Sequence, residues 1–224
     1  MHFDVHFAWE ILPSLLRGAI VTVEATFGGM ALALVGGLLL AVGRMSKLPL
    51  IPFLSLCYIQ FMRNTPLLVQ LYFVFYVLPF VGLTFNALAT GIVGLGLNYS
   101  AYIAEVYRAG IEGVAAGQWE ASTALNMTRG QMLRRIILPQ AVVAMIPPWG
   151  NLFIELLKAT ALVSLITITD LSFKAQEMNQ TTLKTVDIFS LVLLIYLALS
   201  LAITIGMRLM EAGASRGLAR GRMH

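Results

Sequence analysis

The stretch GQWEASTALNMTRGQMLRRIILPQA, residues 117–141, is a polar interruption of an otherwise mostly apolar chain. Its charged residues are Glu120, Arg129, Arg134 and Arg135. Ala121, Ala124 and Leu125 recur at helical spacing and predict a short surface helix, whose other faces are too polar to enter lipid. Asn126 follows this stripe, and asparagine tolerates the left-handed conformation that ends helices. We therefore expect a helix, a sharp turn and a second short helix that leads back into apolar sequence.

The composition around this stretch is that of an integral membrane protein. Hydrophobic residues make up 58% of the 224 residues and charged residues 12%, with a mean hydropathy of +0.83. Soluble domains are nearer half apolar and a quarter charged. The length suits one membrane domain, residues 1–224, with no room for a second globular domain. The single cysteine, Cys57, excludes an intrachain disulfide.

Five apolar segments are long enough for membrane-spanning helices, which need about 20 residues at about 1.5 Å each. They are residues 25–42, 52–79, 85–106, 141–168 and 188–207. The expected fold class is an all-α membrane protein with five transmembrane helices. An odd number of spans places the two termini on opposite sides of the membrane.

The lysines and arginines outside these segments decide the orientation, since cytoplasmic loops carry an excess of them. One side of the membrane holds ten: Arg44, Lys47, Arg108, Arg129, Arg134, Arg135, Arg208, Arg216, Arg220 and Arg222. The other side holds three: Arg17, Lys174 and Lys184. We expect the amino terminus outside, the carboxy terminus in the cytoplasm, and residues 117–141 as a cytoplasmic loop. Because the basic residues follow the edges of apolar segments, the net charge of +4 does not indicate a nucleic-acid partner.

Small residues recur at every fourth position in two of the segments. They are Gly29, Ala33, Gly37 and Ala41 in the first, and Gly96, Ser100 and Ala104 in the third. Such ridges let helix backbones approach closely in lipid. We expect them to pack helices together within one subunit.

The amino terminus has apolar side chains at helical spacing. Phe3, Phe7 and Ile11 predict a short interfacial helix that lies on the membrane. His2 and His6 share this spacing, but no third ligand accompanies them. We interpret them as surface histidines and expect no metal site.

The polar stretch also carries a family motif. Its residues are Glu120-Ala121-Ser122, then Asn126, then Ile136, Leu138 and Pro139. They resemble the pattern Glu-Ala-Ala, three residues, Gly, nine residues, Ile, one residue, Leu-Pro that marks the permease subunits of ABC importers. Ser122 stands in place of Ala and Asn126 in place of Gly, and Asn keeps the turn feasible. The stretches RNTPLLVQLYF (63–73) and AYIAEVYRAGI (101–111) are similar to the polar amino acid branch of that family, and the resemblance covers about residues 14–210.

The resemblance implies a type I importer permease that dimerises with a second permease, either a copy of itself or a sister chain. It also implies two cytoplasmic ATPase subunits, which bind the ATP, and an extracytoplasmic solute-binding protein at a bacterial cytoplasmic (inner) membrane. The polar stretch would be the coupling helix that docks on the ATPase. Its expected contact residues are Gln118, Glu120, Ala121, Asn126 and Arg129. No cofactor is expected in this chain itself.

One departure from the family concerns the solute. Amino acid permeases tend to read Lys-Asp-Thr-Ser-Leu where this chain reads Lys158-Ala159-Thr160-Ala161-Leu162. The absence of the acid and the hydroxyl argues against a standard amino acid. The stretch KATALVSLITITDLSFKAQ, residues 158–176, is similar to permeases for ectoine and hydroxyectoine. The expected solute is a polar amino acid or a small zwitterionic compatible solute of the ectoine type.

Polar residues inside the apolar segments mark a candidate translocation path. They are Arg63, Asn151, Glu155, Lys158 and Thr160. A charge that faces lipid at mid-depth costs at least about 2.5 kcal/mol, so these groups should face protein or water. Two interpretations remain open. Arg63, Glu155 and Lys158 form a buried ion network that fixes helix packing, or Glu155 and Lys158 line a cavity that accepts a zwitterion.

Two other classes of function fit the sequence less well. Glu155 and Lys158 would suit a self-contained proton-coupled carrier or channel, since intramembrane ionisable groups relay protons. Such a carrier leaves the polar stretch unexplained, and the chain lacks the internal repeat of many carriers. A membrane enzyme or an ATPase is not indicated, because the sequence contains neither HExxH nor GxxxxGK[ST], so no catalytic residues are expected.

Overall fold

The computed structural model describes residues 4–221, and every regular element in that range is helical. The long helices are α1 (Val5–Arg44), α2 (Leu50–Asn64), α4 (Ala87–Glu112), α7 (Leu138–Ala159) and α9 (Thr185–Gly221). The shorter α-helices are α3 (Leu67–Tyr72), α5 (Ala116–Ala124), α6 (Arg129–Met132) and α8 (Leu171–Thr182). Two π-helical turns, η1 (Phe73–Val77) and η3 (Leu133–Ile137), and two 3-10 helices, η2 (Leu78–Val81) and η4 (Thr160–Ile166), complete the set.

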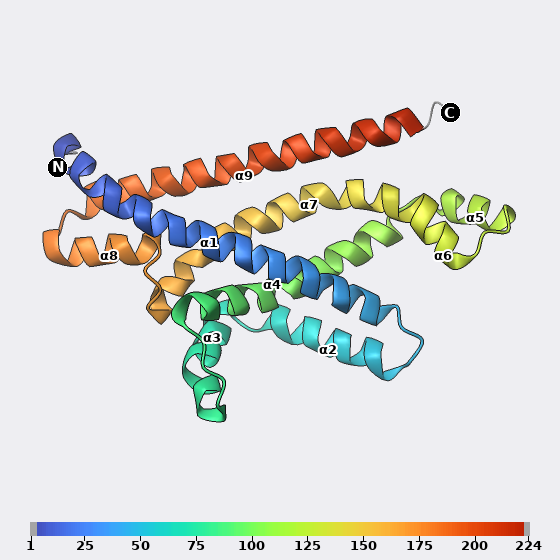
Figure 1. Ribbon diagram of the computed structural model, residues 1–224, viewed down its shortest axis with the longest axis horizontal. Helices are drawn as coiled ribbons and strands as arrows, with labels where there is room; N and C mark the ends of the chain where they lie inside the picture. The colour runs from blue at the N-terminus through green and yellow to red at the C-terminus, as the bar shows by residue number, and fades with distance from the viewer. Residues whose placement is uncertain (1–3, 222–224) are drawn as a thin grey trace.

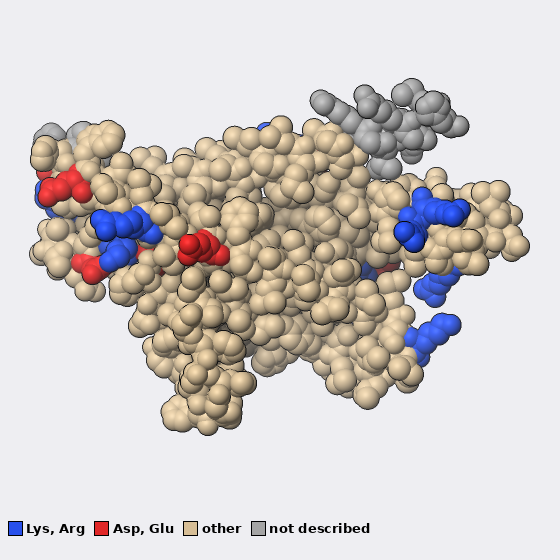
Figure 2. Space-filling view, viewed as in Figure 1, with Lys and Arg blue, Asp and Glu red and all other residues tan. Residues whose placement is uncertain are grey.

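The long helices run between the two ends of an elongated bundle (Figure 1). One end holds the amino terminus and α8, and the other holds α5, α6 and the end of α9. Four helical stretches are long and apolar enough to cross a membrane: His6–Arg44, Ala87–Glu112, Arg129–Ile166 and Thr185–Ser215. Leu50–Asn64 together with Leu67–Val81 makes a fifth span if this bent pair is counted as one. Figure 2 shows charged side chains gathered toward both ends of this face and a mostly uncharged middle, as a membrane-spanning bundle requires. The expected all-α membrane fold is confirmed.

Helix α1 takes the place of the short interfacial helix that the sequence predicted. Asp4 caps α1 by accepting a hydrogen bond from the Phe7 N–H at 3.1 Å. Ile11 is 7% exposed, and Phe7 packs with it against α8 and α9. The prediction is wrong because these side chains face the protein rather than the membrane surface. Their packing holds α1 as one helix through Pro13, a residue type that usually breaks helices.

Helices α1 and α4 approach each other closely along the two ridges of small residues. A Cβ added at Gly37 would lie 2.5 Å from the Ile103 side chain, and one at Gly96 would lie 2.6 Å from the Leu32 side chain. No larger residue fits at either position without movement of the partner helix. The predicted use of these ridges, close helix packing within one subunit, is confirmed.

The second apolar segment is not the single helix that the sequence predicted for residues 52–79. Helix α2 and the helical run that begins with α3 meet at an angle of 107°. Pro66 stands at the bend, and Thr65 before it is extended, because proline lacks an N–H and disfavours a helical residue before it. The Gln70 side-chain amide donates hydrogen bonds to Met62 O at 3.0 Å and to Thr65 O at 3.1 Å. The carbonyls freed by the break are thus satisfied inside the protein, the condition for interrupting a helix at membrane depth.

Candidate functional site

The polar stretch at residues 117–141 forms a projecting end of the molecule (Figure 1). Helix α5 ends in a tight turn where Asn126 has a φ of 55°. Thr128 caps α6 and exchanges hydrogen bonds with Gln131, so both free backbone donors are satisfied locally. The predicted helix, turn and second helix are confirmed, and η3 then continues directly into α7.

The outer face of α5 carries exposed motif residues. Glu120 and Ala121 are exposed, and Leu125 is 75% exposed. Among residues 4–215, whose side chains the structure describes apart from Val5, no cation lies within ion-pair distance of Glu120. Ser122 instead faces inward, 3% exposed. Helix α5 therefore presents one carboxylate and an apolar strip to its surroundings.

Two of the predicted contact residues lie on the other side of this segment, toward the bundle. The Gln118 Oε1 accepts a hydrogen bond from Gln140 Nε2 at 3.4 Å, which connects α5 to α7. Arg129 lines a cavity together with Arg44 of α1 and Arg108 of α4. The five residues expected as ATPase contacts therefore do not share one face.

A cavity of about 340 Å³ lies at the bend between α2 and α3. Its lining includes Arg63, Asn98, Tyr99, Tyr102 and Glu155. The guanidinium carbon of Arg63 lies 5.5 Å from the centroid of the Tyr102 ring, whose face stabilises the cation. The structure thus brings together two of the predicted path residues, Arg63 from α2 and Glu155 from α7, around one polar space.

The other predicted path residues do not line this cavity. Asn151 and Lys158 are exposed on α7, whereas Thr160 is fully buried and its hydroxyl donates to a carbonyl of the preceding turn at 2.7 Å. Arg63 and Glu155 are exposed like Lys158, and no ion pair joins any two of these three in the described part of the chain. A buried ion network of these three residues is not formed within the described chain, because all three side chains are exposed and none pairs with another.

Sequence reasoning missed the residues that hold the bend. Asn98, 4% exposed, donates hydrogen bonds to Met62 O at 3.0 Å and to Gln70 Oε1 at 3.1 Å. Both Gln70 and Asn98 are polar residues within apolar segments, the same signal that singled out Arg63. Their role as partners could not be inferred, because the carbonyl they share became available only through the break.

A second missed group is an ion cluster where α1 and α4 end. Arg44 pairs with Glu105 across the two helices. Arg108 pairs with the same carboxylate at 2.7 Å and with Glu112 at 2.5 Å. In the sequence, Arg44 and Arg108 indicate only the orientation of the chain, and their partner Glu105 lies within the third apolar segment.

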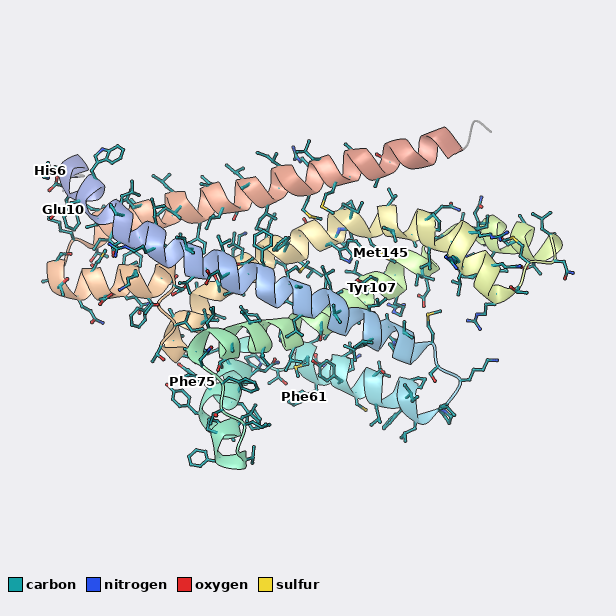
Figure 3. All side chains as sticks on the ribbon, in the orientation of Figure 1. His6, Glu10, Phe61, Phe75, Tyr107 and Met145 are labelled. Carbon is teal, nitrogen blue, oxygen red and sulfur yellow. The ribbon has the colours of Figure 1, made fainter. Side chains whose placement is uncertain are left out.

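Helices α4 and α7 come together near this cluster. Figure 3 shows Tyr107 and Met145 where the two helices run side by side. A Cβ added at Gly110 would lie 2.5 Å from Met145, and the rings of Tyr107 and Trp149 are 5.6 Å apart. The segment that follows the polar stretch thus contacts α4 closely at these positions.

At the opposite end of the molecule, Asp170 caps α8. Its Oδ1 accepts from the Phe173 N–H at 2.8 Å, and the Leu171 N–H donates to Thr22 Oγ1 of α1 at 3.1 Å. The Asp170 side chain is fully buried. A Cβ added at Gly18 would lie 2.8 Å from the backbone carbonyl oxygen of Asp170. Burial raises the pKa of Asp170 to about 6, because desolvation disfavours the charged carboxylate.

The amino-terminal histidines were considered as metal ligands. His6 is exposed and lies with Glu10 at the amino-terminal end (Figure 3). His2 and Phe3 lie outside the described residues. Between residues 4 and 221, no three His, Cys, Asp or Glu side chains are grouped so that they could hold a metal ion.

Comparison with known proteins assigns the fold to a family. The family described as "Binding-protein-dependent transport system inner membrane component" matches residues 33–216. The chain is 38% identical over 213 residues to the probable amino-acid ABC transporter permease y4tF of Sinorhizobium fredii (strain NBRC 101917 / NGR234), which covers 92% of this chain and 90% of that protein. It is 37% identical over 180 residues to the L-cystine transport system permease TcyB of Bacillus subtilis (strain 168), and the match covers 78% of this chain and 77% of that protein.

A solved structure agrees with these relatives. The crystal structure of an amino acid ABC transporter with histidines matches with a TM-score of 0.89 and 34% identity, over 95% of this chain and 99% of that chain. The chain therefore belongs to the family of inner membrane components of binding-protein-dependent transport systems, and it has the type I importer permease fold that the sequence predicted.

Proposed function

We propose that this chain is the permease subunit of an ATP-driven importer for a small zwitterion, a polar amino acid or an ectoine-like solute. The single observation that carries the proposal is the outer face of α5, where Glu120, Ala121 and Leu125 are exposed without a partner in the described chain. A carboxylate beside an apolar strip suits a groove on an ATPase subunit, where charge-assisted hydrogen bonds are stronger than neutral ones. The proposed complex contains a second permease, identical or sister, two ATPase subunits and an extracytoplasmic solute-binding protein.

One helical path connects this face to the cavity. The helical stretch Arg129–Ile166 is continuous from the coupling segment into the bundle, and it carries Glu155. A displacement of α5 by the ATPase would therefore move α7 as a body and change the wall of the cavity. The proposed orientation follows the positive-inside rule, with the coupling segment and the carboxy terminus in the cytoplasm and the amino terminus outside.

The charges of the cavity suit a zwitterion. Arg63 would bind a carboxylate of the solute, and Glu155 would bind its ammonium group, since both side chains line one space without pairing with each other. The relatives named for cystine and for an amino acid transporter with histidines handle solutes of this charge pattern. Ala159 and Ala161, where the sequence departs from the amino acid permeases, do not line the cavity. We therefore assign the choice of solute to Arg63 and Glu155.

The test is uptake by the complete transporter in proteoliposomes, with its ATPase and binding protein. We expect Glu120→Lys to insert normally and to lower ATP-dependent uptake by at least about tenfold, because a lost contact of about 1.4 kcal/mol has that effect. The matched control is Glu211→Lys, another exposed carboxylate in the carboxy-terminal part of α9, a helix that ends at the same end of the bundle as α5 (Figure 1), and it should keep its uptake. Normal uptake by an assembled Glu120→Lys transporter would refute the coupling role.

The same assay distinguishes the solutes and the alternative function. Labelled histidine, cystine and ectoine are compared, with an amino acid methyl ester as a competitor that lacks the carboxylate. Competition by the intact zwitterions but not by the ester supports the assignment of Arg63. Uptake by the chain alone, driven by a proton gradient without ATP, would identify a self-contained carrier instead.

A further inference from the structure

A cavity of about 280 Å³ lies where α1 and α4 end and the coupling segment begins. Its lining includes Arg44, Arg108, Glu112, Trp119 and Arg129. These residues come from four helices that are distant in sequence, α1, α4, α5 and α6. The cavity is separate from the polar space that holds Glu155 at the bend of the second span.

The cavity carries an excess of positive charge. Arg44 and Arg108 both form ion pairs with Glu105, and Arg108 also pairs with Glu112. Arg129 is exposed, and no carboxylate in the described range of the chain lies within ion-pair distance of it. Three guanidinium groups against two carboxylates leave one positive charge, located on the one arginine whose donors are uncommitted.

The cavity also lies where the apolar run of α1 ends. Arg44 ends helix α1 directly after its apolar run. Leu38, Leu39 and Val42, in the last turns of α1 before Arg44, are 49%, 68% and 59% exposed and form an apolar strip. Trp119 in the lining is an amphipathic side chain of the type enriched at membrane interfaces. Figure 2 shows lysine and arginine side chains gathered at this end of the molecule.

We propose that this cavity binds the headgroup of one anionic phospholipid from the adjacent leaflet. The net charge of −1 on such a headgroup matches the single excess positive charge, whereas a zwitterionic headgroup carries a cation of its own, and Arg129 would donate to the phosphodiester oxygens. The acyl chains would lie along the apolar strip of α1, which a free phosphate ion could not use. Because the lining spans α1, α4 and the coupling segment, the bound lipid would fasten the coupling segment to the bundle.

The test is lipid retention by the full chain, measured by native mass spectrometry after exchange with equal amounts of phosphatidylglycerol and phosphatidylcholine. We expect preferential retention of phosphatidylglycerol. Arg129→Gln should lower that retention about fivefold, the effect of one basic residue near an anionic lipid surface. The control is Arg135→Gln, which removes an exposed arginine of the same segment from outside the lining and should change retention by less than twofold.

Four results would overturn the proposal. Equal retention of the two lipids would remove the headgroup preference, and equal loss in the two variants would show a general charge effect. Displacement of the lipid by millimolar inorganic phosphate would assign the cavity to a free anion. If Arg129→Gln retains phosphatidylglycerol but binds the ATPase more weakly, the arginine belongs to the ATPase interface and the lipid site is refuted.

Discussion

Two polar interruptions of this apolar chain, the coupling segment at residues 117–141 and the bend between α2 and α3, are built in opposite ways. The coupling segment is held by neighbours in sequence: the Asn126 turn and the reciprocal hydrogen bonds of Thr128 and Gln131. The bend is held by Gln70 and by Asn98, which lies 36 residues from the carbonyl it reaches.

The difference follows from the solvent that each region meets. The coupling segment projects from the bundle, where water satisfies any backbone group that a cap leaves free. The bend lies within an apolar span, where lipid offers no hydrogen bonds, so each freed carbonyl requires a side chain from the protein. A polar residue in a membrane segment can therefore serve as a brace as readily as a pathway residue.

The largest expected effect comes from removing the brace. Gln70→Leu deletes the donors to Met62 O and Thr65 O and the acceptor for Asn98. We expect a loss of about 3 to 4 kcal/mol in the free energy of unfolding, since each bond contributes about 1 kcal/mol and the orphaned carbonyl adds a desolvation penalty. Thermal unfolding of the purified chain in detergent measures this loss.

The control for this prediction is Gln176→Leu, an exposed glutamine of α8 without a side-chain hydrogen bond in the structure. Its effect should stay within about 0.5 kcal/mol, as for most surface substitutions. If the two variants unfold alike, the bend does not depend on tertiary hydrogen bonds, and the contrast with the coupling segment fails.

A smaller effect is expected at Asp170, a local cap that tertiary packing has buried. Its pKa is about 6 in the folded chain against 3.8 for the ordinary group. As pH rises from about 4 to about 6, the unfolded chain releases this proton while the folded chain retains it, so the folded state loses stability and then reaches a plateau. At about 1.4 kcal/mol per pKa unit, the full loss is on the order of 3 kcal/mol.

Asp170→Asn keeps a capping oxygen but does not titrate. The variant should unfold at nearly the wild-type temperature at pH 4 and at a higher temperature than wild type at pH 7. Glu177→Gln, an exposed acid of the same helix, should follow the wild-type profile. A gap between wild type and Asp170→Asn that does not change with pH would show that burial of this carboxylate has no consequence for stability.

The smallest effect is expected in the coupling segment itself. Asn126→Val places a β-branched residue at a φ of 55°, which costs about 1 to 2 kcal/mol locally, whereas Asn126→Gly should change stability by less than about 0.5 kcal/mol. Hydrogen exchange of the Met127 amide, which donates to Ser122 O at 3.1 Å, reports this loosening. Faster exchange should occur only in the valine variant, with the global unfolding temperature unchanged. A lowered global temperature would mean that the turn supports the whole bundle.

The sequence by itself determined the features that depend on composition and on near neighbours. Apolar length identified the membrane segments, small residues at every fourth position indicated close helix packing within one subunit, and the apolar stripe followed by Asn126 predicted the helix, turn and second helix. Each of these signals is complete within one segment, because helix periodicity, capping and turn chemistry act over a few residues.

Only the tertiary structure decided which groups meet. Pro66 was visible in the sequence, but a proline alone can kink a helix or break it, and the outcome here rests on Gln70 and Asn98 supplying hydrogen bonds from elsewhere. In the same way, Arg63 and Glu155 share a cavity without pairing, and Arg129 turns toward the ends of α1 and α4. These arrangements depend on contacts between residues far apart in the chain, which the pattern of a single sequence does not contain.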